Sequence, residues 1–302
     1  MVAVVVAVAV LQAEAIKVSK ACIYEHVGDP EYKPVPYAGL LSKAYAEHRR
    51  ALISETSAMD TAEPGDPYAF GGVGGAGDSG GVASNGVAGR AAVGPGGQRQ
   101  RSEVYYDSPD TTSFSVLDVD GNAVCCTPTI GEGFGTRVVC GETGMLFNNG
   151  MRIGSTSPYP ENVNYVRPGQ IPLLNNSPVI VLKDGKLKLA MGTPGGEAIG
   201  QTQFQCIMNV LDFELTVQEA IETPRFRLAA SPNFYKPGCP VSMSLESRVP
   251  EETVEQLRSW GHEVKESGPY SICAMQGILV DFETGAASAG ADPRGGYYAV
   301  GY

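Results

Sequence analysis

The sequence predicts an α+β fold in which paired antiparallel strands lie between layers of helices. Two segments, 111–129 and 177–191, show the period-two alternation of a hairpin around an Asp-Gly turn. Helical patterns precede the first hairpin and follow the second. Strand pairs that alternate with helices bury their apolar faces well as a sandwich of two sheets between helical layers.

The length and charge of the chain limit the class of protein to which it can belong. With 302 residues, of which 43% are hydrophobic, it can bury the core of one large domain or two ordinary ones. Its 22 basic and 33 acidic residues give a net charge of −11, and no run of Lys or Arg offsets it. Such a charge repels phosphate backbones. We therefore expect a globular protein with no nucleic acid partner.

We expect three further features to be absent: a metal or cofactor site, a membrane-spanning helix and a signal peptide. Seven cysteines lack Cys-x-x-Cys spacing and three histidines are scattered, so we expect no metal site and no cofactor. The apolar start is shorter than the roughly twenty residues that a membrane-spanning helix needs, and no basic residue precedes it. The sequence therefore predicts neither a membrane span nor a signal peptide.

Two helices and a linker are predicted before the first hairpin. Residues 12–26 have helical spacing, and 38–53 form a second helix with apolar residues such as Leu41 and Tyr45 on one face. Between 71 and 97, nearly half of the residues are glycine, which buries too little apolar surface to offset the entropy of ordering. We expect a flexible linker there.

Three elements are predicted after the second hairpin. An amphipathic helix covers 201–215, and its apolar face includes Phe204 and Leu211. A helix at 250–260 stops at a glycine, and residues 275–282 form a late strand. These elements continue the alternation of helices and strands.

The start of the first hairpin carries a Thr-Thr pair, in which Asp110 precedes Thr111 and Thr112. A threonine hydroxyl is a poor nucleophile. Its own free α-amine can serve as its general base once the peptide bond before it has been cut. Most Thr-Thr pairs before a strand have no chemical role, so the pair alone does not decide the function.

Ordered motifs along the chain extend this observation. They are FGTRVV, GETGMLFNNGM, SPVIVLKDGKLKLAMGTPGG, EAIETPRFRL and GADPRGG. With the Thr-Thr hairpin, they resemble the small subunit of the γ-glutamyltranspeptidase family, strongly over 111–302 and more weakly over 11–65. The resemblance implies an αββα sandwich of the N-terminal-nucleophile hydrolase type, apparently truncated at the N-terminus. It divides the chain into a remnant of large-subunit helices at 1–68, a flexible linker at 69–110 that ends at the processing site, and the small catalytic subunit at 111–302.

The resemblance also implies catalytic roles. Thr111 attacks the carbonyl of Asp110 in the precursor, and the resulting ester is hydrolysed. The new N-terminal Thr111 then serves as nucleophile, and its amine is the base. Thr129 corresponds to the residue whose hydroxyl is hydrogen-bonded to the nucleophile. Gly195 and Gly196 correspond to the backbone donors of the oxyanion hole, each typically worth about 3 to 4 kcal/mol.

The substrate-binding positions depart from the family pattern. The usual Asn is Gly131, the usual Gln is Gly150, and the Asp that binds the substrate amine is Ile153. Leu174 and Asn175 stand where a serine pair binds the carboxylate. Because a charged group buried without partners costs several kcal/mol, we expect an acyl group without an α-ammonium, as in the acylase and amidohydrolase branches.

Three hypotheses follow. The first is a self-processing amidohydrolase or acyltransferase that cleaves a small amide or γ-glutamyl-like substrate through an acyl-Thr111 ester, after which the two chains formed by self-cleavage stay associated. The second is a true γ-glutamyl transferase or glutathione hydrolase, if residues 151–178 align differently. The third is a truncated, non-catalytic fragment.

Overall fold

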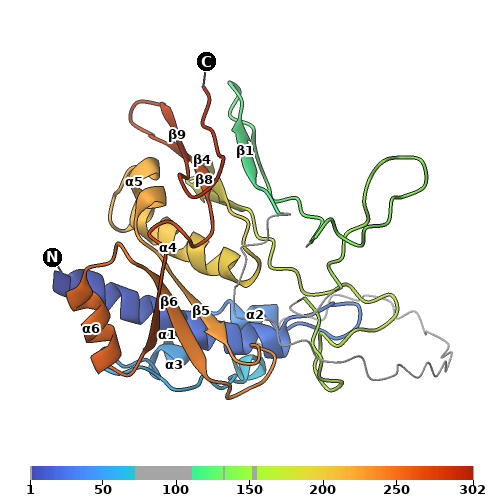
Figure 1. The fold of residues 1–302 in the computed structure, drawn as a ribbon, viewed down its shortest axis with the longest axis vertical. Coiled ribbons are helices and arrows are strands. Elements are labelled where there is room, and N and C mark those ends of the chain that lie inside the picture. Colours follow the sequence, from blue (N-terminus) through green and yellow to red (C-terminus); the bar gives the residue numbers. More distant parts are fainter. Residues whose placement is uncertain (1, 72–110, 132, 152–154, 302) are drawn as a thin grey trace.

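The computed structural model describes residues 2–71, 111–131, 133–151 and 155–301. Most of the predicted linker at 69–110 lies outside the described residues, including Asp110, and so does Ile153. The described chain combines helices with strand pairs, most of them antiparallel, as the sequence predicts (Figure 1).

The largest sheet of the described residues, here called the central sheet, has four antiparallel strands. Its order is β3-β4-β8-β9, with β3 at Val179–Lys183, β4 at Lys186–Gly192, β8 at Gln276–Val280 and β9 at Ala287–Ala291. The predicted hairpin at 177–191 and the strand at 275–282 are therefore confirmed. The last residue of β4 pairs with the first residue of β8, which brings the ends of these two strands together.

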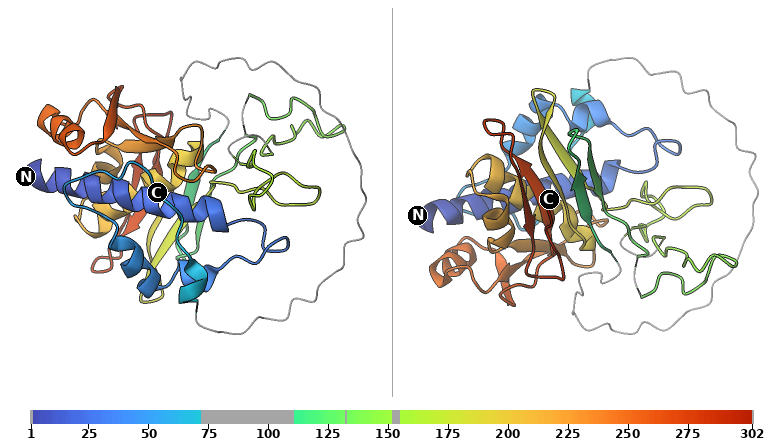
Figure 2. Two further views of the ribbon diagram at one scale, coloured as in Figure 1. Left: turned by 90° about the horizontal axis from the view of Figure 1, so that it is seen from below. Right: turned by 90° about the horizontal axis from the view of Figure 1, so that it is seen from above.

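The first predicted hairpin is also confirmed. Strands β1 (Phe114–Leu117) and β2 (Ala123–Cys126) pair in antiparallel register. The hairpin packs against β4 and β8 (Figure 2), and the Cys125 thiol donates a hydrogen bond to the carbonyl of Met191 at 3.0 Å. This contact fixes the start of the hairpin over the end of β4.

A third sheet contributes to a large hydrophobic core. It contains β5 (Phe226–Ala230), β6 (Val241–Glu246) and β7 (Glu263–Ser267). Strand β6 pairs with β5 in antiparallel orientation and with β7 in parallel orientation, and a helix connects β6 to β7. That helix, α6 (Glu251–Ser259), confirms the prediction at 250–260 and lies beside α1 (Val2–His26) (Figure 1). Apolar residues of α1, β5, β6 and α6 form one buried cluster.

Helix α4 (Ile199–Leu211) lies between the two larger sheets, and α5 (Val217–Glu222) follows it (Figure 1). The predicted helix exists, but its predicted apolar face is wrong. Phe204 is 36% exposed and Leu211 39% exposed.

The buried face of α4 carries glutamines instead, because they complete the free edge of β5. The Gln201 amide donates to the carbonyl of Leu228 at 3.0 Å and accepts from its N–H at 2.7 Å. Gln205 makes the same pair of bonds with Phe226. Buried backbone groups need such partners, so polar side chains are stabilising in this interface.

The predicted helix at 38–53 is wrong in its extent. The structure divides it into α2 (Tyr37–Leu40) and α3 (Lys43–Arg50). The Ser42 hydroxyl accepts a hydrogen bond from the Tyr45 N–H and so begins the second helix, as serine does at N-cap positions. Leu41 lies in the break and is 83% exposed. A short 3₁₀ helix, η1 (Pro67–Phe70), ends this region.

Helix α1 is long, but several of its buried side chains are polar. Glu14 and Lys17 form a buried ion pair at 2.8 Å, and Lys20 is also buried. None of the helices in the described part of the chain has the length and apolar character needed to span a bilayer.

Candidate active site

Thr111 lies at the start of the first hairpin, opposite Thr129. The two residues form an isolated antiparallel bridge, and their side-chain oxygens are 2.7 Å apart, a hydrogen-bonding distance. The N–H of Thr112 donates to the carbonyl of Pro128 at 3.1 Å. The predicted pairing of the Thr111 and Thr129 hydroxyls is therefore present in the fold.

The backbone after Thr111 is anchored by Ser113. Its buried hydroxyl accepts a hydrogen bond from the Gln276 amide at 2.9 Å. A Cβ on Gly192 would lie 2.1 Å from this hydroxyl, so only glycine allows β4 to approach so closely. Because Gly192 and Gln276 are paired at the ends of β4 and β8, the central sheet fixes the position of Thr111.

The Gly195-Gly196 pair turns the chain from β4 into α4. Their φ angles are +128° and +56°, conformations that glycine adopts without strain. Before them, Thr193 is completely buried and its hydroxyl is bonded to the carbonyl of Ala274. Gly195 precedes a 3₁₀ turn, η2 (Gly196–Ala198), and Gly196 begins it; the first backbone N–H groups of such a turn lack helical acceptors and can bind an anionic oxygen.

A pocket with about 520 Å³ of empty space, part of it open to solvent, lies beside Thr111. It brings together seven of the residues that the sequence analysis selected: Thr111, Thr129, Gly131, Gly150, Leu174, Asn175 and Gly196. Gly195 is adjacent in the chain but does not line the pocket. Asp110 and Ile153 lie outside the described residues.

Four lining residues were missed by the sequence analysis: Asn148, Ser155, Asn176 and Glu197. Asn148 connects two of the selected positions, because its amide nitrogen donates to the carbonyl of Thr129 at 2.7 Å and its amide oxygen accepts from the N–H of Gly150. Asn176 donates to the carbonyl of Thr127 at 3.1 Å. The adjacent asparagine pairs in the sequence are a signal for such backbone contacts, since Asn bonds readily to nearby main chain.

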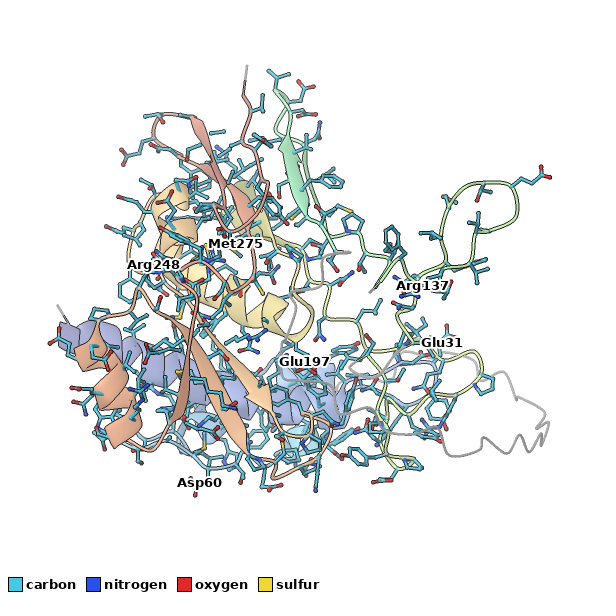
Figure 3. All side chains as sticks on the ribbon, viewed as in Figure 1. Glu31, Asp60, Arg137, Glu197, Arg248 and Met275 are labelled. Atoms are coloured by element: carbon cyan, nitrogen blue, oxygen red, sulfur yellow. The ribbon has the colours of Figure 1, made fainter. Side chains whose placement is uncertain are left out.

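Glu197 joins the pocket to α1 (Figure 3). Its carboxylate accepts a hydrogen bond from the Tyr24 hydroxyl at 3.1 Å, and its main-chain oxygen accepts one from Lys20 at 3.0 Å. Burial, followed by the charge of Glu197, raises the pKa of Tyr24 well above 10, so the phenol remains a donor. An acidic residue directly after a Gly-Gly pair is the sequence signal that could have found it.

Two buried arginines, Arg225 and Arg294, form a network of ion pairs near the site. Arg225 pairs with Asp292 at 2.8 Å, and Arg294 pairs with Glu246 at 2.7 Å. The Asp292 carboxylate also accepts from the N–H of Met275 at 3.0 Å. The network therefore fixes the loop that precedes β8, and the carbonyl of Ala274 in this loop holds Thr193, just before the glycine pair.

Across residues 2–71, 111–131, 133–151 and 155–301, no three His, Cys, Asp or Glu side chains are grouped so that they could hold an ion.

Comparison with known proteins places this geometry in a family. The γ-glutamyltranspeptidase family model matches residues 5–302. The chain is 32% identical over 294 residues to the glutathione hydrolase proenzyme of Escherichia coli K12, covering 94% of this chain and 43% of that protein. It is 32% identical over 285 residues to the acylase ACY 1 proenzyme of Pseudomonas sp. V22, covering 93% of this chain and 42% of that protein. The chain thus spans less than half the length of these relatives.

Solved structures agree with this result. The γ-glutamyltranspeptidase of Pseudomonas nitroreducens superposes with a TM-score of 0.54 and 29% identity over 63% of this chain and 99% of that one. The cephalosporin acylase of Bacillus halodurans has a TM-score of 0.70 over 97% of this chain and 47% of that one, and its 22% identity supports the fold alone. The predicted α+β fold of the N-terminal-nucleophile hydrolase type is confirmed. The chain belongs to the γ-glutamyltranspeptidase family.

Proposed function

We propose that the protein is a self-processing amidohydrolase whose nucleophile is the N-terminal threonine created at residue 111. The observation that carries the proposal is the 2.7 Å contact between the hydroxyls of Thr111 and Thr129 in a pocket that Gly196 also lines. Relatives named glutathione hydrolase proenzyme and acylase proenzyme support the same class of reaction.

Self-cleavage begins in the precursor. The Thr111 hydroxyl oxygen attacks the carbonyl carbon of Asp110, the C–N bond between the two residues breaks, and the acyl group moves to the oxygen as an ester. Water then hydrolyses the ester, which leaves a carboxylate on Asp110 and a free amine on Thr111. Residues 111–302 become the small catalytic subunit in this scheme.

Substrate turnover repeats the chemistry on an external amide. The Thr111 amine accepts the hydroxyl proton as the oxygen attacks the substrate carbonyl, and the leaving amine takes a proton as its bond breaks. Thr129 orients the hydroxyl through its hydrogen bond. The N–H groups of Gly195 and Gly196 stabilise the tetrahedral oxyanion, and water releases the acyl group from Thr111.

The parts before and after the cut remain associated in this proposal. Helix α1, from the segment at 1–68, packs on β5 and α6, which belong to the segment at 111–302. Partly buried hydrogen bonds from Lys20 and Tyr24 to Glu197 cross between the same two segments. Such contacts hold two chains together after the covalent connection has been cut.

The proposal is tested by the mass of the protein expressed from its complete gene. We expect two chains in equal amounts, and N-terminal sequencing of the chain that contains residues 111–302 should begin at Thr111. A single chain that stays intact over prolonged incubation at neutral pH would contradict self-processing and favour the non-catalytic hypothesis.

A further inference from the structure

The charge of the pocket comes from a residue that the sequence analysis did not select. Among the described lining residues, Glu197 is the one with a charged side chain, whereas the others are threonines, asparagines, glycines, a serine and a leucine. It follows Gly196 directly and therefore lies beside the proposed oxyanion donors. Its carboxylate places an anionic group in the wall of the pocket.

The neighbours of Glu197 leave acceptor positions of its carboxylate open to a ligand. Tyr24, a neutral donor, takes one of about four acceptor positions on the carboxylate. Lys20 directs its ammonium group to the main-chain oxygen of Glu197, and its Nζ lies 5.3 Å from the centre of the Tyr24 ring and 5.5 Å from that of Phe234. The charge of Lys20 also attracts that of Glu197 and offsets part of it, but its hydrogen bond goes to the main chain and not to the carboxylate.

Glu197 faces the part of the pocket in which we expect the acyl group of the substrate to bind. Tyr24 is hydrogen-bonded to both Glu197 and Asn175, so the carboxylate and Asn175 share one neighbour. Leu174 and Asn175 are the positions at which the family resemblance expects the acyl group of the substrate. A group bound by Glu197 therefore belongs to the acyl part of the amide and not to the leaving amine.

We infer that Glu197 is a specificity-determining residue that binds an ammonium group on the acyl part of the substrate. The inference rests on the proposed function. It replaces the expectation, based on Ile153 and Leu174, of an acyl group without an α-ammonium. The anionic partner of the ammonium is provided after the glycine pair and not by residue 153. A substrate acyl group with a carboxylate alone is repelled by the same charge.

The experiment compares γ-glutamyl and glutaryl p-nitroanilides, which differ in the α-ammonium, on the protein expressed from its complete gene. We expect the unaltered protein to prefer the γ-glutamyl compound. E197Q keeps the size and the acceptor for Tyr24 but removes the charge, so kcat/KM for γ-glutamyl p-nitroanilide should fall about tenfold to a hundredfold, largely through KM. Turnover of the glutaryl compound should stay constant or rise.

Two further variants separate recognition from structure. E197D keeps the charge and should retain the preference for the γ-glutamyl compound. E252Q removes an exposed glutamate from the first turn of α6 and should change neither rate, which controls for loss of a helix-dipole contact.

Two results would overturn the inference. One is a glutaryl preference in the unaltered protein, which requires no variant to fold. The other is an equal loss on both anilides in E197Q, the result expected of a purely structural residue. Failure of the proposed function is recognised separately, because the unaltered protein would then neither cut itself before Thr111 nor release p-nitroaniline from either compound.

Discussion

Thr111→Ala is expected to leave one uncut chain without amidase activity. The variant lacks the oxygen that attacks Asp110, and it also lacks the nucleophile of the mature site, so hydrolysis should fall by at least about a thousandfold. Intact mass spectrometry and a p-nitroanilide assay measure the two effects.

Thr112→Ala is the matched control, because this exposed neighbour contributes a backbone N–H that alanine retains. It should still yield two chains. Thr111→Ser should also process, since the hydroxyl remains. Cleavage between residues 110 and 111 that survives in Thr111→Ala would refute the assignment of the nucleophile.

Glu246→Ala is expected to have the largest effect on stability. The carboxylate is completely buried and accepts two hydrogen bonds from Arg294 at 2.7 Å and others from the N–H groups of Ser271 and Ile272. Its removal leaves the buried Arg294 guanidinium with Asp292, at 3.0 Å, as its remaining ion-pair partner in the network, and breaking a buried ion pair typically costs about 3 to 5 kcal/mol. Urea unfolding followed by circular dichroism gives the loss of free energy.

Glu266→Gln is the control for this measurement. It breaks an exposed ion pair with Arg258 at 2.9 Å, and such pairs contribute about 1 kcal/mol or less. If Glu246→Ala loses no more stability than Glu266→Gln, the buried network does not hold the loop before β8 in place.

The same network gives the stability a pH dependence of known sign. Burial raises the pKa of Glu246, but the hydrogen bonds and charge of Arg294, with the backbone donors, lower it to a greater extent, so the net shift is downward from 4.5. A depressed pKa in the folded state stabilises the protein above the unfolded pKa. This contribution is therefore lost as the pH falls from about 4.5 through the lowered value.

Both predicted hairpins could be derived from the sequence because their signals are local. Alternation of apolar residues and an Asp-Gly turn fix the register within about fifteen residues, and the structure confirms the strands on both sides of Asp120-Gly121 and Asp184-Gly185. Family resemblance, rather than pattern, selected the residues that line the pocket. For that reason it could group distant positions such as Thr111 and Gly196.

The remaining features depend on contacts between distant segments. Periodicity alone cannot predict that Gln201 and Gln205 are buried, because their partners are backbone groups of a strand more than twenty residues away. Glu197 is likewise positioned by a hydrogen bond from Tyr24, which is 173 residues away in the sequence. Polar residues buried for their hydrogen bonds have no hydrophobic pattern to reveal them.

The central claim is that Thr111 carries the acyl group during turnover. The most direct measurement is to mix the processed protein with a γ-glutamyl anilide, quench in acid within the first turnover, and find the acyl group by peptide mass spectrometry. The account predicts the mass of the acyl group on the peptide that begins with Thr111, and its absence from the same peptide after the substrate has been exhausted. Acylation of a different residue, or rapid turnover with residue 111 unmodified at every time point, would contradict it.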